Sequence, residues 1–244
     1  MRILGVIPAR FASTRYRGKP LVDINGKSMI QRVYEQALKS TKLDEVVVAT
    51  DDERILLHVN ELGYRAILTS DQHQSGTDRC AEVAQKIPGF DVVVNIQGDE
   101  PYIDPKQIDL LCACFADGDT VLATLIKEIN SVEELNNINS PKVVINRMSE
   151  AIYFSRTPIP YFRGKDQSEW LKEQVYYKHI GIYGYRTDTL LAITQLPVSN
   201  LEKTEALEQL RWIENGYRIK TAVTDIETIA VDTPEDLEKI NRDQ

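Results

Sequence analysis

The sequence has little of what marks several large classes of proteins. It contains 3 cysteines among 244 residues, so Cys80, Cys112 and Cys114 cannot all pair with one another, and we interpret them as reduced thiols. No apolar run is long enough for a membrane-spanning helix, and no signal peptide precedes the first predicted strand. These absences predict a cytoplasmic protein without membrane insertion.

Positive charge is also scarce. The chain has 29 Lys and Arg against 37 Asp and Glu, a net charge of -8, and no long basic run. That balance argues against a nucleic-acid partner. The Walker pattern GxxxxGK[ST], the hydrolase pattern GxSxG and the usual zinc-ligand spacings are absent as well.

What the sequence does contain is a regular alternation of strands and helices. Apolar runs predict strands over residues 2–8, 45–50, 65–69 and 92–96, and periodic segments predict helices over 29–40, 53–62, 80–86 and 105–115. Short connections between them favour parallel pairing through right-handed crossovers. We therefore expect an α/β fold with a mainly parallel central sheet and helices on both faces.

The later part of the chain has a different style. An aromatic, β-prone segment over 151–156 suggests an antiparallel addition that packs against a second subunit, and residues 202–215 read as one helix. We expect a single domain over 1–244 with an embellishment over roughly 150–185.

The strand at 92–96 ends in the turn Gln97-Gly98-Asp99-Glu100-Pro101. In open α/β sheets ligands bind outside the carboxyl ends of the strands, and two carboxylates there suggest a hard cation such as Mg²⁺. The alternative is an ordinary polar turn that closes a strand.

A basic loop over residues 9–20 follows the first strand. It carries cationic, hydroxyl and glycine residues, namely Arg10, Ser13, Thr14, Arg15, Arg17, Gly18 and Lys19. Backbone amides and guanidinium groups in such a loop converge on phosphate groups. Together with Asp99 and the distant Asp232, the loop predicts Mg²⁺-chelated triphosphate binding and attack on an α-phosphate with pyrophosphate leaving.

Seven segments in their joint order resemble the 3-deoxy-manno-octulosonate cytidylyltransferases, the CMP-Kdo synthetases, over essentially the whole chain. They are IPARFASTRYRGKPL at 7–21, HQSGTDR at 73–79, NIQGDEP at 95–101, YFSRTPIP at 153–160, KHIGIYGYR at 178–186, LEQLRWIENG at 207–216 and VDTPEDLE at 231–238. The resemblance implies a Rossmann-like nucleotide-sugar transferase fold and a homodimer. It also implies Mg²⁺-dependent transfer of CMP from CTP to Kdo, for lipopolysaccharide biosynthesis.

The same resemblance implies roles for individual residues. Arg10, Ser13, Arg15 and Lys19 would bind the triphosphate, Arg79 and Gln97 the nucleotide region, and Asp99 and Asp232 the metal; Arg10 and Lys19 would also act in catalysis. The sugar acid would be recognised by Arg156, His179, Tyr183, Glu208 and Gln209. Alternatives are CMP activation of 8-amino-Kdo or a sialic acid, nucleotidyl transfer to a phosphorylated alcohol, and a non-catalytic nucleotide-binding protein.

Overall fold

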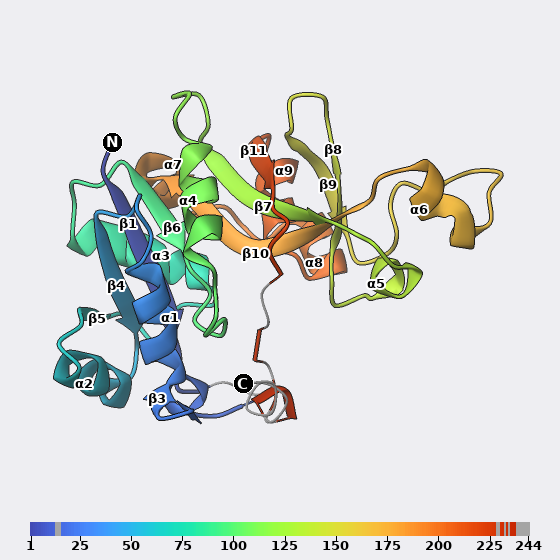
Figure 1. Cartoon of the computed structure of the whole chain (residues 1–244). Helices are drawn as coiled ribbons and strands as arrows, with labels where there is room; N and C mark the ends of the chain where they lie inside the picture. The colour runs from blue at the N-terminus through green and yellow to red at the C-terminus, as the bar shows by residue number, and fades with distance from the viewer. Residues whose placement is uncertain (13–15, 228–229, 232, 234, 238–244) are drawn as a thin grey trace. The chain divides into compact units, whose positions relative to one another are not determined.

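Two units of structure form along the chain, each from segments that are discontinuous in sequence. The structure, a computed structural model, describes residues 1–12, 16–227, 230–231, 233 and 235–237 (Figure 1). The first unit comprises Met1–Cys112, Gly184–Thr194 and Glu227–Gln244, and the second comprises Ala113–Tyr183 and Gln195–Ile226. That the chain forms one domain over 1–244 stays a prediction.

The first unit is built on a parallel sheet. Its strands lie in the order β6-β1-β4-β5, with bounds Val92–Asn95, Ile3–Ala9, Glu45–Thr50 and Ala66–Leu68. Each neighbouring pair is parallel. Side chains along β1, β4 and β6 are almost all buried, as expected for strands covered on both faces. The predicted parallel sheet is therefore confirmed.

Helices cover this sheet. They are α1 (Met29–Ala37), α2 (Glu53–Glu61), α3 (Gly76–Lys86) and α7 (Thr187–Ile193), while α4 (Pro105–Ala113) ends at the boundary of the unit. In Figure 1, α1 lies in front of β1 and β4 and α3 lies behind the sheet. The helix predicted to begin at Cys80 begins four residues earlier, because Ser75 and Asp78 form a capping box.

Between β1 and α1 the chain forms two short features. One is the 3₁₀ turn η1 (Lys19–Leu21), and the other is the hairpin of β2 (Asp23–Ile24) and β3 (Lys27–Ser28). Asn25 and Gly26 both have positive φ at the hairpin tip, as an Asn-Gly turn requires.

The carboxyl ends of the four parallel strands meet at one edge of the sheet. From β1 the chain passes to β4 on one side and later returns to β6 on the other, so the strand order reverses between β1 and β6. Gly98, in the turn after β6, approaches β1 so closely that a Cβ atom there would lie 2.5 Å from the Pro8 carbonyl oxygen. Ligands bind at such a reversal in open α/β sheets.

The second unit mixes parallel and antiparallel pairing. β7 (Leu122–Glu128) pairs in parallel with β11 (Ile219–Val223). β8 (Lys142–Ile145) lies antiparallel between β9 (Ala151–Ser155) and β10 (Tyr177–Arg186), of which the residues up to Tyr183 belong to this unit. The predicted antiparallel addition is confirmed. Beside it lie α5 (Val132–Asn136), η2 (Gln167–Glu169) and α6 (Trp170–Glu173), over an apolar cluster of Ile129, Leu135, Trp170 and Tyr176.

The prediction of one helix over 202–215 is wrong. The chain forms α8 (Asn200–Glu205) and α9 (Gln209–Glu214), separated by Ala206 in the left-handed region at φ 51° and ψ 50°. Arg211 and Glu202 form a two-pronged ion pair that joins the two short helices. Among the helices described, none has the length and apolarity needed to span a membrane.

Candidate active site

In the first unit, Lys19 and Asp99 form the centre of the polar groups at the strand reversal. The Lys19 ammonium donates to Asp99 Oδ2 at 2.9 Å and to the carbonyl oxygen of Val231 at 2.7 Å. The Val231 backbone N–H in turn donates to the carbonyl oxygen of Asp99 at 2.9 Å. The loop after β1, the turn after β6 and the segment at Val231 are thereby joined.

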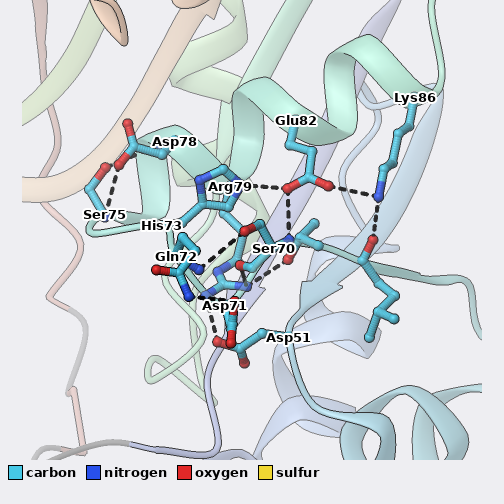
Figure 2. A network of polar contacts seen from close by, with 12 residues as sticks. Asp51, Ser70, Asp71, Gln72, His73, Ser75, Asp78, Arg79, Glu82 and Lys86 are labelled. Carbon is cyan, nitrogen blue, oxygen red and sulfur yellow. Dashed lines mark hydrogen bonds and ion pairs between the residues drawn. The ribbon is translucent and has the colours of Figure 1, made fainter.

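A second polar network lies at the ends of β4 and β5 (Figure 2). Arg79 from α3 is fully buried and donates to Asp51 Oδ2 at 2.8 Å and Thr69 Oγ1 at 2.6 Å. Its Nε atom is buried without a hydrogen-bond partner among the described residues. The Asp51 carboxylate compensates the charge of this buried guanidinium group. Together with the bond to Thr69, it fixes the orientation of Arg79 at the edge of the sheet.

Arg10 and His73 extend this network. Arg10 donates to the His73 carbonyl oxygen, and the His73 ring contacts the Glu82 carboxylate. Burial, and then the positive charge of Arg79, lower the pKa of the Arg10 guanidinium, although Asp51 opposes the shift. The two guanidinium groups therefore lie near each other, and the Asp51 carboxylate paired with Arg79 offsets part of their positive charge.

Glu82 is the anionic counterpart of this cationic region. Burial raises the pKa of its carboxyl group, but hydrogen bonds from Lys86, the Ser70 backbone and His73 outweigh burial and bring the pKa to about 2. Figure 2 shows these donors around the carboxylate. The loop over 70–73 is thus tied to α3 by charge-assisted bonds.

Three of the predicted site residues, Ser13, Arg15 and Asp232, lie outside the described residues. Gln97 is partly buried directly after β6. The other residues predicted to bind the triphosphate and the nucleotide are described, and they lie at the carboxyl edge of the first unit's sheet. These are Arg10, Lys19, Arg79 and Gln97.

The second unit contains the residues predicted to recognise a sugar acid. His179 lies on β10, with its ring centroid 5.2 Å from that of Phe154 and 5.1 Å from that of Tyr183, and its Nε2 atom is 2.9 Å from Thr124 Oγ1. The residue keeps some accessible surface, yet burial of the imidazole lowers its pKa to about 3. His179 is therefore neutral at neutral pH.

Arg156 follows β9 and is held by carbonyl groups. Its Nε donates to the Glu205 carbonyl at 2.6 Å, and its two terminal nitrogens donate to the carbonyl oxygens of Ile138 at 3.0 Å and Ala206 at 3.1 Å. The cation thus lies at the C-terminal end of α8, where the helix dipole favours positive charge.

Glu208 and Gln209 lie at the start of α9. Gln209 is 4% exposed, and its Nε2 atom is buried without a hydrogen-bond partner among the described residues. A buried amide in this state costs free energy unless a ligand supplies an acceptor. Gln209 is thus a donor suited to a polar ligand.

Sequence reasoning missed four groups that hold these residues in place: Asp51, Thr124, Glu205 and Val231. Asp51 directly follows the predicted strand over 45–50, but its ion pair with Arg79 spans 28 residues and is not visible in the sequence. Thr124 lies among the apolar residues at the start of β7, and Val231 acts through its backbone. Glu205 accepts from Ser155 Oγ at 2.7 Å and from the Arg156 backbone at 2.9 Å.

Comparison with known proteins identifies the family of this arrangement. A family model for cytidylyltransferases matches residues 4–226. The chain is 59% identical to a 3-deoxy-manno-octulosonate cytidylyltransferase from Parabacteroides distasonis, covering 98% of this chain and 96% of the relative. The chain belongs to the 3-deoxy-manno-octulosonate cytidylyltransferase family.

A second relative and a solved structure agree with this family assignment. The protein of the same name from Bacteroides thetaiotaomicron is 56% identical over 97% of this chain and 96% of its own length. A solved structure of a CMP:2-keto-3-deoxy-manno-octonic acid synthetase in complex with CTP superimposes with a TM-score of 0.92 at 44% identity, over 99% of this chain and 98% of that one. The predicted family, nucleotide-sugar transferase fold and enzyme class are confirmed.

Proposed function

We propose that this cytidylyltransferase transfers CMP from CTP to the anomeric hydroxyl of Kdo, with Mg²⁺ as cofactor. Pyrophosphate leaves, and the product is CMP-Kdo for lipopolysaccharide biosynthesis. The observation that carries the proposal is the joining of Lys19 to Asp99 at the strand reversal, at a sheet edge where Arg10 follows β1 and Arg79 lies on α3. Family membership supplies the substrates, through relatives whose names state that chemistry.

The described residues supply some of the oxygen ligands that a bound Mg²⁺ ion would need. Asp99 offers a carboxylate whose side chain is 30% exposed, and Lys19 contacts only one of its two oxygens. Mg²⁺ is commonly held by one or two carboxylates together with substrate phosphates, so a cluster of three protein ligands is not required. Asp99 would be one ligand, and we propose Asp232, which follows Val231 in the sequence, as the other. When bound, Mg²⁺ neutralises phosphate charge and lowers the pKa of a coordinated hydroxyl group.

The cationic side chains of the first unit have a role in orienting CTP. Arg10 and Lys19 would neutralise phosphate oxygens, and Ser13 and Arg15 in the same loop would add further donors. Arg79 is committed to Asp51 and Thr69, so its contribution to the nucleotide region is to hold that edge rigid and to orient nearby groups. Positioning and charge neutralisation are the main sources of rate in phosphoryl transfer.

The second unit supplies groups suited to a sugar acid. Neutral His179, Tyr183, Glu208 and the unpartnered amide of Gln209 can bond to hydroxyl groups, and Arg156 can pair with a carboxylate. A related acceptor such as 8-amino-Kdo or a sialic acid would use the same groups.

The first test measures pyrophosphate release from CTP in the presence of Mg²⁺, with Kdo, 8-amino-Kdo and N-acetylneuraminate supplied in parallel. We expect release with Kdo, and its loss when the metal is chelated. Release only with another acid would overturn the acceptor, and release that survives chelation would overturn the metal.

The second test replaces Asp99. We expect Asp99→Asn to reduce turnover at least about 100-fold while the dissociation constant for CTP changes little, because the neutral amide keeps its shape but loses the charge for metal. Calorimetric titration with CTP and the pyrophosphate assay separate the two effects. Asp119→Asn, at an exposed position, is the matched control. Near-normal turnover in Asp99→Asn would contradict the proposed role.

We also propose a cytoplasmic homodimer. Apolar side chains in and beside the 150–185 segment are exposed, including Ile152 at 55%, Tyr161 at 76% and Val175 at 44%. Their coverage by a second copy would remove this surface from water. Light scattering coupled to gel filtration tests the dimer, and a monomer at micromolar concentration would contradict it.

A further inference from the structure

Thr124 lies within β7, and its hydroxyl is the meeting point of three polar groups. The side chain is fully buried. Its Oγ1 atom is 2.7 Å from the carbonyl oxygen of Ile182, 3.2 Å from that of Ile180 and 2.9 Å from Nε2 of His179. All four residues belong to the second unit.

These distances determine where the protons are. A hydroxyl has one proton, and a carbonyl oxygen can only accept. Two oxygens at 2.7 Å repel each other unless a proton lies between them, and this is the usual distance of an O–H···O bond. Thr124 therefore donates to the Ile182 carbonyl oxygen. Its oxygen is then left as an acceptor toward His179, so the proton of that contact is on Nε2.

The other ring nitrogen of His179 is then bare. Phe154 and Tyr183 pack against the ring, and no carboxylate contacts it among the described residues. Burial lowers the pKa of the imidazole to about 3, so one proton is present rather than two. None of the described residues hydrogen-bonds to Nδ1, and the residue keeps some accessible surface.

We propose that Thr124 is a positioning residue that holds His179 as the neutral Nε2–H tautomer, so that Nδ1 accepts a hydrogen bond from a hydroxyl group of the sugar acid. The second half of this inference rests on the proposed function. The consequence is selectivity for a donor at that point of the acceptor. A hydroxyl bonds to the bare nitrogen, whereas a keto or ether oxygen there would meet another acceptor.

The first test needs no substrate. The chain has 3 histidines, so nitrogen-15 spectra of histidine-labelled protein contain few ring signals, and His58→Gln and His73→Gln variants identify those of His179. We expect one protonated nitrogen at Nε2 and one bare nitrogen at Nδ1 near neutral pH. A spectrum of the Nδ1–H tautomer, or of a doubly protonated ring, would overturn the proposal.

The second test uses Thr124→Val, which removes the hydroxyl with little change of shape, and Thr124→Ser, which restores it. We expect Thr124→Val to populate the other tautomer and to raise KM for Kdo about 10-fold, with KM for CTP nearly unchanged. Thr124→Ser should return both values close to those of the unaltered protein.

Thr221→Val is the matched control. Thr221 is the Cα partner of Thr124 on β11, is 4% exposed, and donates to the Ser149 carbonyl oxygen at 2.9 Å. Thr221→Val also removes a buried threonine hydroxyl from this sheet, so its effect measures the loss of stability without a change at His179. An unchanged tautomer and unchanged KM for Kdo in Thr124→Val, or an equal effect in Thr221→Val, would overturn the positioning role.

The two proposals fail in different ways. Turnover with another sugar acid, but not with Kdo, would contradict the proposed acceptor. The tautomer spectra of Thr124→Val and Thr124→Ser would still confirm or overturn the link between Thr124 and His179.

Discussion

The ammonium group of Lys19 lies between the Asp99 carboxylate, at 2.9 Å, and the Val231 carbonyl oxygen, at 2.7 Å. Its side chain is 13% exposed, so the pair is only partly screened by water. A carboxylate and a cation are thereby fixed at the reversal of strand order, which is where ligands bind in open α/β sheets.

Lys19→Met removes this cation while keeping the length of the side chain. We expect kcat/KM for CTP to fall at least about 100-fold, because a charge-assisted contact to phosphate and the orientation of Asp99 are lost together. Lys19→Arg should not restore activity. The planar guanidinium group of arginine is larger than the lysine ammonium group and does not fit between the Asp99 carboxylate and the Val231 carbonyl oxygen. Lys39→Met, at an exposed position just after α1, is the control. Activity within threefold of the control would contradict this prediction.

Glu82 makes the stability of the first unit depend on pH. The pKa of its carboxyl group falls from the reference value of 4.5 to about 2, so its stabilisation is complete above pH 4.5 and is lost as the pH falls through 2. We expect Glu82→Gln to lower the free energy of unfolding at pH 7 by up to about 3 kcal/mol, which is the free-energy equivalent of this pKa shift. The Glu82 side chain is 21% exposed, so solvent screens the interaction only in part.

Denaturant titrations at several pH values between 2 and 7 check this expectation. The difference between the unaltered protein and Glu82→Gln should shrink as the pH falls from 4.5 toward 2. Glu61→Gln, an exposed substitution at the end of α2, should show no such trend. A difference that is constant over the whole range would show that the carboxylate charge is not responsible.

Gly98→Ala tests the close approach of the turn to β1. The added Cβ would lie 2.5 Å from the Pro8 carbonyl oxygen, so the turn must move, at a cost of about 1–3 kcal/mol in unfolding free energy. Movement would also displace Asp99, and we expect turnover to fall with stability. Gly118→Ala is the contrast, because Gly118 has φ 79° but open space around its Cα. It should cost about 1 kcal/mol and leave turnover unchanged. Normal turnover in Gly98→Ala would contradict the link.

Ala206→Gly is expected to stabilise the protein. Ala206 ends α8 in the left-handed region, where glycine has no Cβ penalty, so we expect a gain of about 0.5–1 kcal/mol in thermal or chemical unfolding. Ala192→Gly, at an exposed position inside α7, should cost a similar amount. Loss of stability in Ala206→Gly would show that the left-handed conformation carries no strain.

Much of the fold could be predicted because strands buried on both faces leave continuous apolar runs in the sequence. The strand at Val92–Asn95 and its polar turn are confirmed for that reason. The antiparallel addition at Ala151–Ser155 is also confirmed, but it was predicted from its aromatic, β-prone residues. The break between α8 and α9 was not predictable. No glycine or proline marks it, and tertiary contacts such as the Arg211–Glu202 pair hold Ala206 in an uncommon conformation.

The candidate site was predictable only in the groups whose chemistry is visible in sequence. Arg10, Lys19 and Asp99 stand out as charged residues in the loop and the turn that follow β1 and β6. Thr124 does not, because threonine is common in strands and looks there like any other strand residue. Its partners become apparent only when β10 is placed beside β7.

Val231 has a consequence for how the protein is made. Its backbone bonds to both Lys19 and Asp99, yet it follows Lys19 by 212 residues in the chain. During synthesis, the part of the first unit over Met1–Cys112 emerges from the ribosome long before this segment does. The earlier residues can pair and bury their core, but Lys19 and Asp99 lack their third partner until translation passes Val231. Nascent chains released before that point would lack the bonds that join Val231 to Lys19 and Asp99 at the candidate active site.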